Sequence, residues 1–237
     1  MAEDAGNAAT PTWLDLYDWR RRVAALYAAR EADHLAVRDP LATITHFRAA
    51  KDDLFKRHPQ SPFDAQARVS FAGLRYFPYN PALRLVADFA PEPAEDTSAE
   101  ETQLAASGTH TMRFRRAARV NFTIAAQAYA LTVYWIDVYG GGLFLPFRDA
   151  TCPQESYGAG RYLFDTVKGS DFLLADPQQA AGDVMGLTSG RILLDFNYAY
   201  NPSCAYDPHW VCPLAAQENT LPIPIRAGER TYHEDHA

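Results

Sequence analysis

The feature that most constrains the fold of this chain is a long stretch of β-forming residues, from Thr109 to Val138. β-Branched and aromatic side chains dominate the stretch, as is typical of pleated, half-buried strands. The segment Ala125-Ala126-Gln127 interrupts it near the middle. We therefore predict two strands joined by a hairpin turn, which is the simplest unit of an antiparallel sheet.

The same character extends on both sides of this hairpin. Apolar residues alternate with polar ones over residues 83–89, which predicts a strand with one buried face. Acidic residues 91–107 are predicted to form a surface loop. Further strands are predicted near residues 69–77, 143–147, 160–167, 191–197 and 221–225. About seven to nine short strands separated by turn signals indicate an antiparallel β-barrel or sandwich, and the lack of alternating βαβ units disfavours a doubly wound nucleotide-binding fold.

Two helices are predicted before the strands. Thr12 to Asp15 resembles a capping box, and the apolar spacing that follows predicts a helix ending before Asp33, with Trp13 and Trp19 on its core face. Asp39-Pro40 has the pattern of a second helix start, and this helix should end at His58-Pro59. The fold class is therefore mainly β with N-terminal helices (α+β), a barrel or sandwich capped by two helices.

Domain organisation and location follow from composition. We expect a tail at residues 1–10, a helical segment at 11–60, an antiparallel β domain at 61–230 and a second tail at 231–237. The chain has 237 residues, 48% of them hydrophobic, and a net charge of -7, which disfavours nucleic acid as a partner. It contains no apolar run of the ~18 residues that a membrane span needs. The acidic N-terminus has no apolar segment of a secretory signal, so we expect a cytoplasmic protein.

Polar residues gather among glycines and aromatics in the C-terminal half, where a plain core would not need them. We predict that they line a ligand pocket, with Arg161 as the organiser because its five donors suit carboxylates or an anionic ligand. On strand parity, Asp195 and Asn197 share one face, opposite Phe196, and Arg161 is the best partner for Asp195. The alternative is a structural ion-pair network. The predicted ligand-binding residues are Asp149, Tyr157, Arg161, Asp195, Asn197, Cys204 and Glu229.

The cysteines allow several chemistries. Cys204, His209 and Cys212 have suitable donor atoms for zinc, but they lack a paired knuckle and a fourth ligand, so no metal is expected. Cys204 and Cys212 are expected as a disulfide or as two structural thiols. Cys204 could act as a nucleophile only with a nearby base, for which His209 is the sequence-near candidate. The pattern indicates no particular cofactor.

Several motifs resemble a bacterial and archaeal family known as the domain of unknown function 1684 (DUF1684). The resemblance covers roughly residues 13–230, and its most specific part is the run from Asp195 to Tyr206. Ser156 and Phe164 depart from the residues more familiar in the family. The resemblance implies family membership and no established activity. The remaining segments that carry it are 61–62, 73–77, 147–151, 156–163, 212–214, 218–219 and 227–229.

These observations favour binding of a small polar or anionic molecule, in a pocket of the β domain, as the function. Two alternatives stay open. The protein could be a hydrolase that uses Cys204 or paired carboxylates, for which Asp149, Asp195, Glu218 and Glu229 are the candidates. It could also be a structural or partner-binding module in which the polar residues serve only stability.

Overall fold

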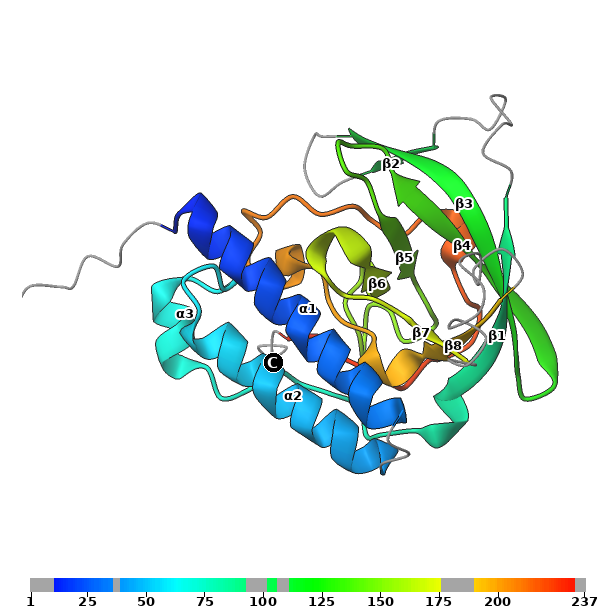
Figure 1. Ribbon diagram of the computed structural model, residues 1–237, viewed down its shortest axis with the longest axis horizontal. Helices are drawn as coiled ribbons and strands as arrows, with labels where there is room; N and C mark the ends of the chain where they lie inside the picture. The colour runs from blue at the N-terminus through cyan, green and yellow to red at the C-terminus, as the bar shows by residue number, and fades with distance from the viewer. Residues whose placement is uncertain (1–10, 36–38, 93–101, 106–110, 176–189, 233–237) are drawn as a thin grey trace, which may run out of the picture.

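A computed structural model describes residues 11–35, 39–92, 102–105, 111–175 and 190–232 of the chain. The predicted tail at residues 1–10 and most of the predicted tail at 231–237 lie outside this range. Figure 1 shows helices on one side of the molecule and a curled sheet on the other.

The N-terminal helices are α1 (Trp13–Leu35), α2 (Pro40–Arg57) and the short α3 (Ala65–Ser70). Thr12 and Asp15 form the predicted capping box, in which each side chain accepts a hydrogen bond from the backbone N–H of the other. The Asp39 carboxylate accepts the Leu41 N–H at 2.9 Å and caps α2. Both predicted starts are confirmed, whereas α1 continues past Asp33 to Leu35. Among the described residues, no helix is both long and apolar enough to cross a lipid bilayer.

The two tryptophans of α1 have different environments. Trp19 packs against Phe55 of α2 with 5.4 Å between ring centres, as expected for a core-facing residue. Trp13 is 86% exposed, so its predicted place on the core face is wrong. It occupies the first turn of α1, and the layer beneath the helix begins only with later turns.

Within the described part of the chain, eight strands form one antiparallel sheet, in which β6-β5-β4-β3-β1-β8-β7 are neighbours and β2 pairs with β3. The sheet is open and curled, a half-barrel, and its combination with N-terminal helices confirms the α+β class (Figure 1). The strands are β1 (Arg84–Pro91), β2 (Thr102–Ala105), β3 (Thr111–Ile124), β4 (Gln127–Ile136), β5 (Leu143–Phe147), β6 (Arg161–Asp165), β7 (Leu173–Leu174) and β8 (Arg191–Asp195).

Four strand predictions need correction. Val69 lies in α3 and is 79% exposed, so no strand begins there. Residues 102–105, inside the predicted loop, form β2 because β3 is long enough to pair beyond β1. The strand predicted to reach Asn197 ends at Asp195, where Phe196–Tyr198 turn into a 3₁₀-helix. Residues 221–225 form no strand, although the N–H of Leu221 still bonds to the backbone of Arg148.

The segment that follows β8 lies between the helices and the sheet (orange in Figure 1). Phe196 and Ala199 belong to the core of the sheet, whereas Tyr198 packs against Phe47 of α2. Phe196 and Ala199 face the sheet and Tyr198 faces α2 because the period of a 3₁₀-helix, about three residues, places positions 196 and 199 on one side. Tyr206 packs against Phe55 farther along α2. This segment is therefore the layer on which the helices rest.

The β3–β4 hairpin provides a test of local backbone strain. Ala125 and Ala126, its turn residues, have φ values of 49° and 65°, a region that costs a residue with a Cβ about 1–2 kcal/mol. Asparagine and glycine are the residues that such two-residue turns favour. We expect the double variant Ala125→Asn/Ala126→Gly to raise the free energy of unfolding by about 1 kcal/mol, measured by urea denaturation.

The matched control is Ala128→Gly, two residues farther along in β4. Glycine there adds backbone freedom to the unfolded chain and relieves no strain, so it should destabilise the protein by about 0.5–1 kcal/mol. A turn variant that is no more stable than the parent would show that these φ values store no strain.

Candidate functional site

Arg161, in the first position of β6, is the centre of the buried polar network. It has no exposed surface. One of its terminal nitrogens, Nη2, donates to Asp149 Oδ2 and to the Ile225 carbonyl, each at 2.8 Å, while Nη1 donates to the carbonyls of Ala227 and Glu229. Of the carboxylates among the predicted site residues, Arg161 pairs with Asp149.

Asp149 completes the contacts to the same backbone. Its Oδ1 accepts the N–H groups of Thr151 at 2.9 Å and Ile225 at 3.0 Å. The ion pair thus satisfies both backbone groups of Ile225, which has no strand neighbour to bond with. Buried backbone groups need such partners. The geometry therefore favours a structural role for both charged residues, and their predicted ligand binding stays a prediction.

Gly228 permits the close approach of this C-terminal segment. Its φ is +74°, and a Cβ at this position would lie 2.5 Å from the Ala199 carbonyl oxygen. Any side chain would therefore push the segment away from the layer that follows β8. The Glu229 N–H bonds to the same Ala199 carbonyl at 2.8 Å, which fixes the position of the Glu229 side chain.

Glu229 is buried and holds three donors from different parts of the chain. Lys51 Nζ of α2 lies 2.6 Å from its Oε1. The backbone N–H of Asn201 and the hydroxyl of Tyr206 both donate to its Oε2. One carboxylate therefore joins α2 to the layer that follows β8.

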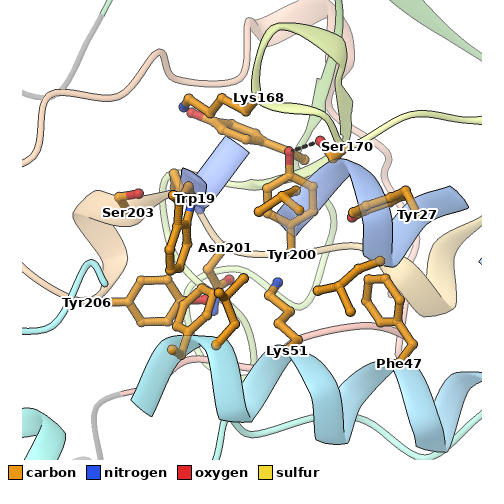
Figure 2. A pocket seen from close by; sticks show the side chains of 16 residues that line it. Trp19, Tyr27, Phe47, Lys51, Lys168, Ser170, Tyr200, Asn201, Ser203 and Tyr206 are labelled. Carbon is orange, nitrogen blue, oxygen red and sulfur yellow. Dashed lines mark hydrogen bonds between the residues drawn. The ribbon is translucent and has the colours of Figure 1, made fainter. Parts of the chain in front are cut away.

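A cavity of about 80 Å³ lies directly beside this cluster, between α1, α2 and residues 200–206. Figure 2 shows the Lys51 ammonium group near its centre, with Asn201 between Lys51 and Tyr206. The ammonium nitrogen lies 4.8 Å from the centre of the Tyr200 ring and 5.3 Å from that of Phe55. Apolar and aromatic side chains form most of the wall, and the polar lining residues, tyrosines aside, are Lys51, Lys168, Ser170, Asn201 and Ser203.

The tyrosines of the wall are neutral hydrogen-bonding groups. Burial raises the pKa of Tyr200 and of Tyr206 well above the ordinary value, and the nearby Glu229 carboxylate raises that of Tyr206 further. The Tyr200 hydroxyl lies 2.6 Å from Ser170 Oγ (Figure 2). The residues that line this cavity include no histidine, cysteine or carboxylate.

Asp195 and Asn197 form a second polar group at the end of β8. Asn197 donates its backbone and side-chain N–H groups to Asp195 Oδ1, and its amide also exchanges two hydrogen bonds with the backbone of Asn80. Arg84 Nε lies 3.5 Å from Asp195 Oδ2, so Arg84 takes the place predicted for Arg161. The strand-parity argument is wrong here, because Asn197 lies in a 3₁₀-helix whose N-cap is Asp195.

The three cysteines are present as thiols. The backbone N–H of Cys204 donates to Cys212 Sγ at 3.4 Å, and the hydroxyl of Tyr157 lies 3.6 Å from Cys204 Sγ. The contact with Cys204, together with burial, raises the pKa of the Cys212 thiol. His209 pairs with Asp207 at 2.7 Å. Among the described residues, no group of three or more His, Cys, Asp or Glu side chains could hold a metal ion.

None of the seven predicted ligand-binding residues lines the cavity. Glu229 lies nearest to it, since its carboxylate accepts hydrogen bonds from two lining residues, from Lys51 and from the backbone N–H of Asn201. The prediction missed Lys51, which the sequence does signal: it stands four residues from Phe47 and from Phe55, on the apolar face of α2. A lone charge on such a face needs a buried partner or a ligand.

The Arg161 network provides a stability test. We expect Arg161→Ala to lower the free energy of unfolding by about 3–5 kcal/mol, because Asp149 would remain buried without a cation. Urea denaturation of the purified variant measures this loss.

Arg226→Ala is the matched control, since Arg226 forms a two-pronged pair with Glu155 on the surface. Exposed pairs contribute about 0–1 kcal/mol. Equal losses in the two variants would refute the central role of Arg161.

Asp195 provides a pH test. Burial raises the pKa of its carboxyl group, against the opposing effects of Asn197 and Arg84. The folded protein then binds this proton more tightly than the unfolded chain, so the site loses stability as the pH rises through the folded pKa. Asp195→Asn removes this dependence. We expect the variant to gain in stability relative to the parent as the pH rises above about 4, the ordinary value of the carboxyl pKa, and an unchanged difference would contradict the shift.

Comparison with known proteins places the chain in a family. The sequence model of the family described as "Protein of unknown function (DUF1684)" matches residues 69–230. No curated protein matches. The solution NMR structure of an uncharacterized protein from Haloarcula marismortui is similar in fold, with a TM-score of 0.53 and 32% sequence identity, over 80% of this chain and 93% of that one. The match covers more than half of the chain, and the chain therefore belongs to the DUF1684 family.

Proposed function

We propose that the protein binds a small polar or anionic molecule in the cavity between α1, α2 and residues 200–206. The observation that carries this proposal is the Lys51 ammonium group, which stands among apolar and aromatic walls. Glu229 accepts one hydrogen bond from it, and an ammonium group has three donors. Concave, mostly apolar sites with a few convergent polar groups are the usual form of small-molecule sites.

The charges favour an anion or a neutral polar molecule over a cation. The aromatic faces of Phe55 and Tyr200, which would attract a cationic ligand, already carry the Lys51 ammonium group. Lys168 adds a second positive charge to the lining. Its partner Asp165 lies 3.4 Å away and is not part of the wall.

The size of the cavity favours a small ligand. A single water needs about 10–15 Å³, so 80 Å³ accommodates on the order of six waters or a molecule of similar size. A branched four- or five-carbon acid is of this order. Binding also has more support than hydrolysis, because the residues that line the cavity include no histidine or carboxylate to act as a general base toward Ser170 or Ser203.

Isobutyrate and isobutylamine form a matched pair of probes for this proposal. We expect isobutyrate to shift the backbone amide NMR signals of cavity residues and isobutylamine to leave them unchanged, because only the anion complements Lys51. Val23→Phe should weaken isobutyrate binding about tenfold or more, since the larger side chain fills the cavity.

Val69→Phe is the control, because it makes the same change at a residue that is 79% exposed on α3. It should leave the affinity unchanged. Equal effects of the two variants, or shifts confined to residues outside the cavity, would refute binding at this place.

A further inference from the structure

The Asn201 side chain carries a buried acceptor without a partner. The residue is 4% exposed, and its Nδ2 donates to the Arg230 carbonyl at 2.8 Å. This hydrogen bond fixes the orientation of the amide, because the reverse orientation would bring two oxygens together. The other end of the amide, Oδ1, is buried and accepts no hydrogen bond from the described residues. Buried polar atoms are normally satisfied, so an unpaired one beside a cavity indicates a missing donor.

Lys51 supplies the complementary group at the same place. Its ammonium nitrogen and the Asn201 backbone N–H bind the two oxygens of one carboxylate, that of Glu229. The two residues are thereby held side by side, and Figure 2 shows both side chains at the cavity. The two residues thus place a cationic donor and an unpaired buried acceptor next to each other beside the cavity.

We infer that the ligand is a small 2-hydroxycarboxylate, an inference that rests on the proposed function and deepens it. The carboxylate accepts hydrogen bonds from Lys51, and the adjacent hydroxyl donates to Asn201 Oδ1. The apolar remainder of the molecule contacts the walls formed by Val23, Leu26 and Phe47.

Simpler ligands satisfy only one of the two groups. A plain carboxylate binds Lys51 but brings a second acceptor, or nothing, to Asn201 Oδ1. An amine donates to Asn201 but places a positive charge beside Lys51. A neutral amide provides both a donor and an acceptor, but it gains no charge–charge attraction from Lys51 or Lys168.

The test compares three acids of equal carbon skeleton, measured by amide NMR titration of the full chain. They are 3-methylbutyrate, 2-hydroxy-3-methylbutyrate and 3-hydroxy-3-methylbutyrate, which differ only in the presence and position of the hydroxyl group. We expect the 2-hydroxy acid to bind about tenfold more tightly than either of the others. In Asn201→Ala this preference should disappear, while the affinity for 3-methylbutyrate stays within about threefold.

Each outcome separates the inference from the proposed function. If none of the acids binds at the cavity, the proposed function fails and the inference fails with it. If all three bind there equally, binding stands and the hydroxyl inference is overturned, as it is when 3-methylbutyrate binds most tightly. The comparison in the parent protein decides the question even where Asn201→Ala does not fold.

Discussion

The buried ion pair between Asp149 and Arg161 is the interaction on which the site depends. The C-terminal segment at residues 225–229 belongs to no strand of the sheet and makes an isolated β-bridge between Glu229 and Tyr76, yet it runs through the interior. Arg161 and Asp149 form hydrogen bonds with four of its backbone groups, which would otherwise need the partners that a neighbouring strand supplies. Glu229 lies at the end of this segment, and it holds Lys51 and Asn201 in turn. The Asp149–Arg161 ion pair, at the edge of the half-barrel, thus helps to position Lys51 and Asn201 in the cavity, although neither member of the pair lines it.

The sequence predicted the parts of the fold that depend on local pattern. The hairpin between β3 and β4, the caps of α1 and α2, and the strand at Arg161 follow from residue type and spacing alone. The turn at Phe196–Tyr198 did not, because the alternation of polar and apolar residues continues through it with the period of a strand. Residues 221–225 have strand character too, but no strand lies beside them for pairing. In both cases the outcome depends on which residues are neighbours in space, and a single sequence does not give that information.

The sequence indicated which carboxylates need a cation, but it did not indicate which cation each of them would meet. Burial implied that the buried acidic residues of the predicted polar cluster need cations, and Asp149, Asp195 and Glu229 each have one. Arg161 meets Asp149, Arg84 meets Asp195 and Lys51 meets Glu229. Two of these three cations come from outside the polar cluster, one from α2 and one from β1. Sequence distance carries no information about such contacts, so the cavity could not be assembled from the cluster alone.

The helices α1 and α2 rest mainly on the layer that follows β8, so they contact a part of the chain that the family match covers. The family match begins at residue 69, beyond both helices. Residues 200–206 lie within the matched range, whereas Trp19, Val23 and Lys51 lie before it. A relative that kept the matched residues and carried a different N-terminal segment would retain Asn201 and Glu229 but meet them with another wall. The cavity therefore joins residues inside the family match to residues that precede it, and its shape depends on both.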